Sequence, residues 1–224
     1  MNTRTAAYVA YLSGIFAILS GVFAILFFWL EAPYLSNGAG QQTHIWGPLS
    51  DICPIVQMLA LLMVVQALYR LDRSDTTLLD RITYLFGLAG TLGVSILQLL
   101  LIIGVIPFEQ EVGPMLIATA AVGAWLILVN AQRRRQPRLS AQQAGLGVAV
   151  GLALMLQPLL LSALGGATNW QNSFSNPLSM VGAALVFVMS YVGFPIWAFW
   201  QGRTLIAHQP ELSRRPEAAI ARAQ

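Results

Sequence analysis

The stretch ITYLFGLAGTLGVSILQLLLIIGVI, residues 82–106, contains no charged residue. An apolar run of about 20 residues crosses a membrane as an α-helix, because each residue rises about 1.5 Å and the hydrocarbon core is about 30 Å thick. Five further runs are similar, which gives six predicted spans: 8–30, 52–71, 82–106, 112–130, 144–164 and 178–200. We therefore expect an all-α, polytopic membrane protein, with a bundle of six transmembrane helices over 1–203 and a polar cytoplasmic tail over 204–224.

The composition is typical of the same class of protein. Hydrophobic residues make up 57% of the chain and charged residues 9%, whereas charged residues make up about a quarter of an ordinary soluble domain. The net charge of +3 comes from arginines that flank the apolar runs, so we expect membrane lipids as their partner and no nucleic acid. The chain has no lysine, which excludes a Schiff base with a lysine and a phosphate-binding P-loop.

The arginines also predict the orientation, because cytoplasmic loops carry the excess of basic residues. Arginines precede the first predicted span, lie between the second and third and between the fourth and fifth, and follow the sixth. The connections 31–51, 107–111 and 165–177 contain none. We expect a protein of the inner (cytoplasmic) membrane with both termini in the cytoplasm.

Small residues predict where helices approach one another closely. The first span carries Gly14 and Gly21, and the third carries Gly87, Gly90 and Gly93. We expect these glycines to pack against neighbouring helices, against a membrane-protein partner, or against a second copy of the chain.

Metal and nucleophilic chemistry have little support. The two histidines, His44 and His208, fall in connections predicted to lie on opposite sides of the membrane, so we expect no haem, no zinc and no other cofactor. An intramembrane enzyme using Asp51, Cys53 and His44 is the least favoured function. We expect instead that Asp51 caps the second span and that Cys53 packs as a small apolar residue.

A glutamine is costly in hydrocarbon unless it is hydrogen-bonded, and three occur at similar predicted depth, in the outer halves of their spans. They are Gln57, Gln98 and Gln157. Two readings stay open: hydrogen bonds between helices, or a polar cavity. Prolines favour the cavity, because Pro158 and Pro195 each remove a backbone donor and predict a kink.

The outer connections add further candidate ligand-binding side chains above the glutamines: Asp51, His44 and Trp46. Tryptophans at this level are also typical of an ordinary interfacial belt. On the inner side, a dense basic patch predicts contact with anionic lipid headgroups; its members are Arg133, Arg134, Arg135 and Arg138.

Two short stretches carry a family resemblance. Leu49-Ser50-Asp51-Ile52, leading to residues 67–71, and Phe194-Pro195-Ile196-Trp197-Ala198 resemble uncharacterised bacterial six-helix membrane proteins, classed as a domain of unknown function. The resemblance implies a bacterial cytoplasmic membrane and no catalytic residue.

Three functions follow from the sequence, in order of preference. The first is a structural or accessory membrane subunit, not an enzyme, because no ionisable residue is predicted to be left inside the bilayer. The second is binding or uncoupled transport of a neutral or lipid-like small molecule in an outer-half cavity around the three glutamines, since ion-coupled transport usually needs an intramembrane ionisable group. The third is the enzyme named above.

Overall fold

The computed structural model describes residues 3–31, 45–71, 77–134, 140–163 and 177–207. These residues form helices without any strand, namely α1 (Thr3–Leu26), α3 (Trp46–Leu71), α4 (Leu78–Ile102), α5 (Phe108–Arg133), α6 (Ala141–Ala163), α8 (Pro177–Val188) and α9 (Phe194–Ala207), with the π-helical segments η1 (Phe27–Glu31) and η4 (Met189–Gly193). Six spans are long and apolar enough to cross a membrane, at Thr3–Glu31, Trp46–Leu71, Leu78–Ile102, Gln110–Arg133, Ala141–Leu160 and Met180–Ala207. The expected six-helix bundle is thereby confirmed.

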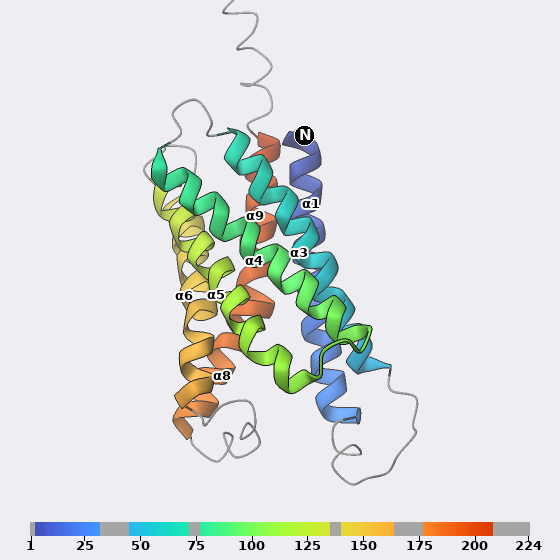
Figure 1. Ribbon diagram of the computed structural model, residues 1–224. Helices are drawn as coiled ribbons and strands as arrows, with labels where there is room; N and C mark the ends of the chain where they lie inside the picture. Colours follow the sequence, from blue (N-terminus) through green and yellow to red (C-terminus); the bar gives the residue numbers. More distant parts are fainter. Residues whose placement is uncertain (1–2, 32–44, 72–76, 135–139, 164–176, 208–224) are drawn as a thin grey trace, which may run out of the picture.

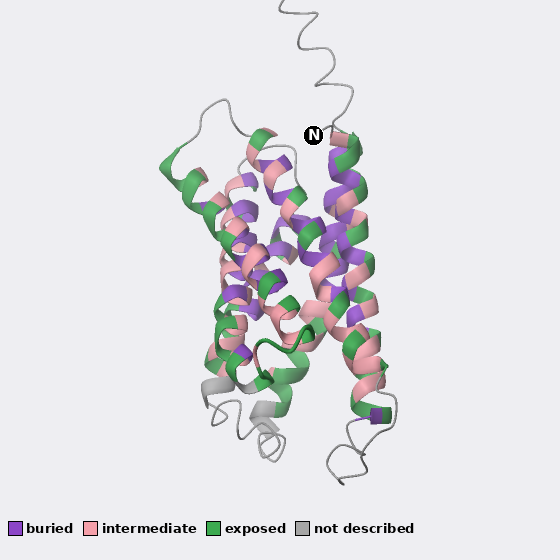
Figure 2. Ribbon diagram, turned by 45° about the vertical axis from the view of Figure 1, so that its right-hand side comes forward, coloured by how far each residue is buried: buried purple, intermediate pink, exposed green. Residues whose placement is uncertain are grey.

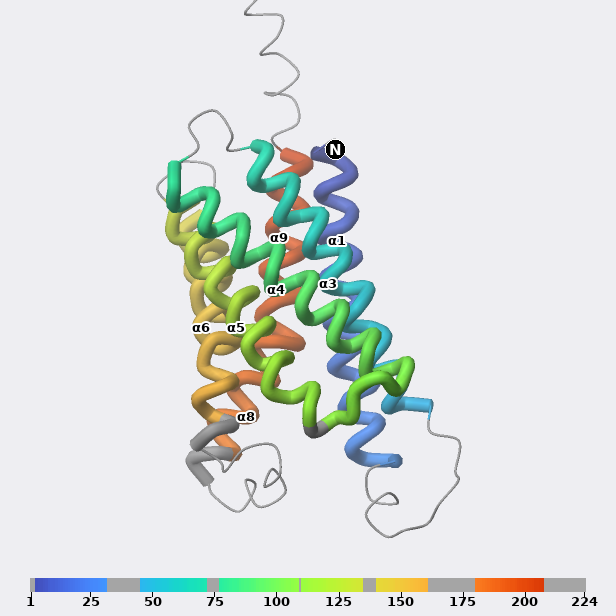
Figure 3. The backbone as a smooth tube through the Cα atoms, viewed as in Figure 1, coloured from blue at the N-terminus to red at the C-terminus, as the bar shows by residue number. Residues whose placement is uncertain are grey.

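The spans run alternately up and down and close into a ring in chain order (Figure 1). Contacts join α1 to α3, α3 to α4, α4 to α5, and α5 to α6, while α6 contacts η4 and α9, and α9 returns to α1. The tube in Figure 3 follows the same alternation, so Thr3 and Ala207 lie at one end of the bundle. In such a ring, all six spans border the centre of the bundle.

The observed helix ends differ from the predicted ones for local reasons. The α4 helix begins with a capping box, in which Thr77 and Asp80 exchange hydrogen bonds between side chain and backbone. It ends at Ile102 instead of residue 106 because Gly104 adopts a φ of 72°, a conformation open to glycine that breaks the helix. The last span continues through Arg203 to Ala207. Residues 204–207, which were predicted to belong to the polar tail, are therefore helical.

The five glycines singled out from the sequence pack within the chain. A Cβ added at Gly14 would lie 2.9 Å from Phe199, and one at Gly21 would lie 2.8 Å from Tyr191. The three glycines of α4 face the neighbouring helices in the same way, Gly87 against Trp125 and Val65, Gly90 against Val122, and Gly93 against Ala118. A partner protein or second copy stays a prediction, and it needs a surface other than these glycines.

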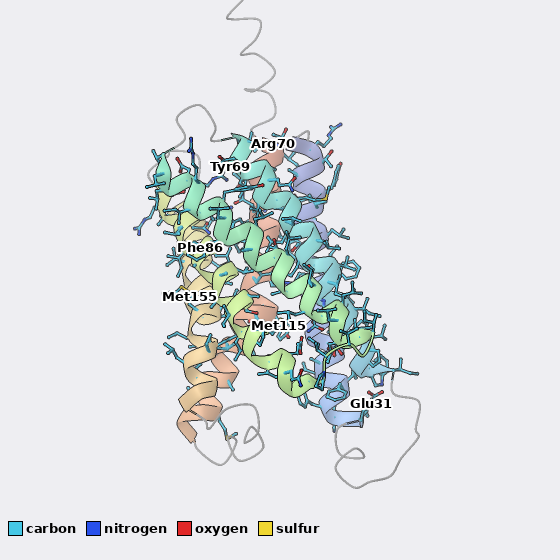
Figure 4. All side chains as sticks on the ribbon, viewed as in Figure 1. Glu31, Tyr69, Arg70, Phe86, Met115 and Met155 are labelled. Atoms are coloured by element: carbon cyan, nitrogen blue, oxygen red, sulfur yellow. The ribbon has the colours of Figure 1, made fainter. Side chains whose placement is uncertain are left out.

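Charge is divided between the two ends of the bundle. The described arginines lie at the end that holds Thr3 and Ala207, which we call the arginine end; they are Arg4, Arg70, Arg81, Arg133, Arg134 and Arg203. Glu31, Asp51 and Glu111 lie toward the other end, which we call the acidic end. Figure 4 labels Arg70 and Glu31 at these opposite ends.

Burial is unequal along the bundle. The large buried side chains belong to the middle and to the arginine half, among them Leu61, Leu68, Trp125, Leu126 and Trp197. In Figure 2 the buried positions are concentrated there, and the lower half shows mainly intermediate and exposed ones. The helices are therefore packed less tightly toward the acidic end.

Candidate functional site

Gln57, Gln98 and Gln157 line one cavity of about 200 Å³. The glutamines come from α3, α4 and α6, and the remaining lining comes from α1, α5, η4 and α9, so every span of the ring contributes. Of the two readings left open by the sequence, the structure supports a shared cavity at the centre of the bundle, with mainly apolar walls and a few polar groups.

The three glutamines converge although their distances from the helix ends differ. Gln98 lies near the last turn of α4, whereas Gln57 lies about three turns into α3, which starts early at Trp46. Gln57 is 8% exposed and its backbone carbonyl accepts a hydrogen bond from the Ser13 hydroxyl on α1, at 3.1 Å. The α1–α3 contact thus holds the Gln57 wall of the cavity in place.

The π-helical segment η4 shapes the opposite wall. Pro195 lacks an N–H group, and the backbone widens just before it, where the N–H of Phe194 donates to the carbonyl of Met189. Ser190 and Tyr191 lie in this widened turn and both line the cavity. Pro158 lies inside a continuous α6 instead, so the interruption predicted from the two prolines occurs at Pro195.

Tyr191 is held against α1 by two contacts. Its ring lies over Gly21, where a Cβ would be 2.8 Å from its Cγ. Its hydroxyl shares a hydrogen bond with the Ser20 side chain, and Ser20 also donates a 3.4 Å hydrogen bond to the carbonyl of Ser50 on α3. This wall of the cavity therefore depends on glycine at position 21.

Two oxygen atoms in the lining have no hydrogen-bond partner among the described residues. They are Oε1 of Gln98 and Oγ of Ser190, and both atoms are buried. A buried acceptor without a partner costs about 1–3 kcal/mol. Such atoms in a cavity indicate a site whose hydrogen bonds are completed by a molecule from outside the chain.

The floor of the cavity, toward the arginine end, is Phe194, and two tryptophans that do not line the cavity pack behind it. The Phe194 and Trp197 rings lie 5.8 Å apart. Trp125 and Trp197 meet edge to face at 5.9 Å and 89°, and each is at most 2% exposed. The indole N–H of Trp197 donates a 3.1 Å hydrogen bond to Oδ1 of Asn130, so this aromatic floor is also fixed by a polar contact.

Below the floor, a second polar group joins α6 to α9 and is largely satisfied. Gln143 Nε2 donates to Gln201 Oε1 at 3.3 Å, and the Thr204 hydroxyl donates to Gln143 Oε1 at 3.1 Å. These side chains bind one another, in contrast to the glutamines of the cavity. Gln143 and Gln201 fall one residue outside the predicted spans 144–164 and 178–200, so their polarity gave no signal in the sequence.

Glu31 caps α3 in place of Asp51. Its carboxylate accepts hydrogen bonds from the backbone N–H groups of Ile45, Trp46 and Gly47 at 2.7, 3.0 and 3.1 Å. The expectation that Asp51 caps this helix is therefore wrong, since the helix begins at Trp46 and Asp51 lies more than one turn inside it. A cap contributed by a separate helix leaves no local sequence signal.

Asp51 lies beside the cavity without forming part of its lining. It precedes the lining residues Pro54 and Met58 by three and seven positions, so it lies on the same helical face, nearer the acidic end. Asp51 also interacts electrostatically with Tyr191, which lines the cavity. Its side chain is partly buried.

Glu111 approaches the same place from α5. It precedes the lining residues Met115 and Thr119 by four and eight positions, and Figure 4 shows Met115 in the half of α5 nearer the acidic end. Glu111 is 3% exposed, its Oε1 has no hydrogen-bond partner within the described ranges, and its charge interacts with that of Asp51. Both residues therefore lie inside helical spans that begin earlier than the sequence predicted, and their carboxyl groups interact electrostatically beside the cavity, on its side nearer the acidic end.

The other candidate residues lie elsewhere. Trp46 stacks on Phe23 at 5.9 Å and 30°, outside the cavity lining. Cys53 is a buried free cysteine, 4% exposed, and His44 lies outside the described residues. No group of three or more metal-ligating side chains occurs in the part of the chain that the structure describes.

The basic patch is only partly described. Arg134 is exposed at the end of α5, but Arg133 is 8% exposed, so its guanidinium is not open to lipid headgroups in the way that Arg134 is. Arg135 and Arg138 lie outside the described residues, and lipid contact by this patch stays a prediction.

Comparison with known protein families, with curated proteins and with solved structures finds no match for this chain. The resemblance to bacterial six-helix membrane proteins stays a prediction, and function is inferred from the cavity itself.

Proposed function

We propose that this chain is a multi-pass protein of a bacterial cytoplasmic membrane that binds a small molecule in its central cavity, which the molecule enters from the acidic end. The observation that carries this function is the convergence of three glutamines from three helices on one cavity with unpartnered oxygens. Ligand sites are concave, mostly apolar and equipped with a few polar groups that fix orientation. The cavity has this character, with apolar walls from Met58, Val94 and Leu154.

The size of the cavity limits the ligand. A dry protein cavity of about 150 Å³ holds benzene, so 200 Å³ suits a molecule of about ten non-hydrogen atoms. A whole lipid is too large, although one end of a lipid is not. The ligand is therefore a small molecule or the terminal group of a larger one.

The orientation follows from the arginines. If the arginine end faces the cytoplasm, the mouth that we propose beside Asp51 and Glu111 faces outward. The floor, formed by Phe194 with Trp197 packed behind it, faces inward. Uncoupled transport, expected as one form of this function, additionally requires the floor to move. Binding requires no such movement, and for that reason we place it first.

The structural or accessory role has lost part of its support. The glycine faces that favoured docking are filled by the chain's own side chains, such as Phe199 and Tyr191. Packing alone also does not require unpartnered oxygens at the bundle centre, because an apolar core avoids their cost. The accessory role and the absence of enzymatic activity stay predictions.

Native mass spectrometry of the protein, extracted in mild detergent from its host membrane, tests the binding function. We expect a small molecule to co-purify with the wild type and to be lost when Gln57, Gln98 and Gln157 are replaced together by leucine. A matched control is Gln132→Leu, which removes a glutamine bonded to Thr83 outside the cavity and should leave the bound molecule in place. Retention of the molecule by the triple variant would contradict the cavity site, and a co-purifying polypeptide without a small molecule would favour the accessory role.

A further inference from the structure

We infer that the cavity selects a small organic cation, an ammonium group on an apolar body, and that Asp51 and Glu111 hold the cationic group at its mouth. The inference rests on the proposed binding function and names the class of ligand. It departs from the neutral ligand expected from the sequence, because that expectation assumed that no ionisable side chain is left within the spans.

The first reason is the chemistry of the unpartnered atoms. Three buried oxygens around this site have no hydrogen-bond partner in the described parts of the chain: Oε1 of Gln98, Oγ of Ser190 and Oε1 of Glu111. The amide oxygen of Gln98 and an ionised carboxylate at Glu111 can only accept hydrogen bonds, whereas the Ser190 hydroxyl can donate or accept. The ligand that satisfies them must bring donors, and an ammonium group brings up to three.

The second reason is the charge around the mouth. The carboxyl groups of Asp51 and Glu111 interact electrostatically, and two like charges disfavour each other unless a positive charge or a proton compensates them. The chain has no arginine or lysine over residues 5–69, 82–132 and 139–202. The described arginines lie at the other end of the bundle, so no described basic side chain balances the two acids.

The third reason is the body of the cavity beneath the carboxyl groups. Its lining is largely apolar and includes an aromatic ring at the floor, through Met58, Val94, Met115, Val122, Leu154 and Phe194. A bare metal ion needs a close shell of oxygens and no apolar space. A cation attached to a hydrocarbon group fills both parts of the site, and aromatic faces such as Tyr191 add to its binding.

Two probes of nearly equal size, one charged and one neutral, test whether charge or shape determines binding to the cavity. The full chain in phosphatidylcholine nanodiscs is titrated with 2-phenylethylammonium and, separately, with the neutral 2-phenylethanol, by calorimetry against empty nanodiscs. We expect the ammonium probe to bind about tenfold more tightly or better, since hydrogen bonds to charged groups are the stronger ones. Asp51→Asn and Glu111→Gln should each remove about tenfold of that preference and leave the affinity for the alcohol unchanged.

Asp80→Asn is the matched control, because Asp80 lies at the arginine end in the capping box of α4, and it should keep the preference. Equal binding of the two probes, or a preference that survives both carboxyl variants, would overturn the cation inference and leave the binding function standing. Failure of both probes to bind would overturn both for molecules of this size. Titration with sodium chloride tests for a metal-ion site. If sodium ions bind in a manner that depends on Asp51 and Glu111 and the ammonium probe does not bind, the inference would also be overturned.

Discussion

Oε1 of Glu31 accepts a 2.7 Å hydrogen bond from the backbone N–H of Ile45 and so joins the end of the first span to the start of the second. The same carboxylate binds the next two N–H groups of α3, where the helix dipole also favours negative charge. Because Glu31 caps α3, the Asp51 side chain, more than one turn inside the helix, is not needed as a cap and can take part in ligand binding.

Removal of this cap should destabilise the protein. We expect Glu31→Ala to lower the free energy of unfolding by about 1–2 kcal/mol, the usual effect of losing a cap, as measured by denaturant titration in detergent. Asp51→Asn is the control and should be neutral or stabilising, since it relieves repulsion with Glu111. A greater loss at Asp51 than at Glu31 would show that Asp51 caps the helix after all.

The Gln98 side chain should destabilise the protein when no ligand is bound. Its Oε1 is buried without a described partner, so Gln98→Leu should raise the free energy of unfolding by about 1 kcal/mol. Gln132→Leu, which breaks the 3.1 Å hydrogen bond to Thr83, should instead lower it by about 0.5–1.5 kcal/mol. Equal losses in the two variants would indicate that Gln98 has a packing role only.

Gly21 should be necessary for the shape of the cavity. An alanine Cβ there meets the Tyr191 ring at 2.8 Å, so Gly21→Ala must push the ring away from α1 and toward the cavity. We expect weaker binding of the ammonium probe in the same calorimetric titration. Gly145→Ala is the control, because a Cβ at that position meets nothing within 4 Å and should leave affinity unchanged; an unaffected Gly21→Ala would mean that Tyr191 does not shape the site.

The floor of the cavity should depend on the hydrogen bond between Trp197 and Asn130. Trp197→Phe removes the N–H donor and leaves Oδ1 of Asn130 buried, and we expect a loss of about 1–2 kcal/mol in the free energy of unfolding. A double-mutant cycle with Asn130→Ala measures the coupling between the two side chains. Additive effects would show that the hydrogen bond contributes nothing to the floor.

The orientation is testable with single cysteines in a Cys53→Ala background. Leu78 is 74% exposed at the arginine end, and Val105 is 63% exposed at the acidic end. A maleimide that does not cross membranes, added to intact spheroplasts, should label Val105→Cys and spare Leu78→Cys until the membrane is permeabilised. The reverse pattern would place the arginine end and both termini outside.

The sequence was sufficient for the spans and for the separation of charge, because both are properties of single segments. Hydrophobic runs such as residues 82–106 specify helices of membrane length, and the alternation of arginines between connections already indicated that both termini lie at one end. It also indicated the three glutamines as a group, since each is conspicuous in its own apolar surroundings. It did not predict the helix ends, since α4 ends at Ile102, before the turn at Gly104, and not at residue 106.

Only the tertiary structure decided what these residues face. Whether Gln57, Gln98 and Gln157 meet depends on the rotation and offset of three helices, and a helix can bury any face once its neighbours supply the packing. Glu31 caps a helix that it does not belong to, and Asp51 interacts electrostatically with Glu111, 60 residues further along the chain. Such contacts depend on how segments distant in sequence are arranged in space, and local pattern contains no information about that arrangement.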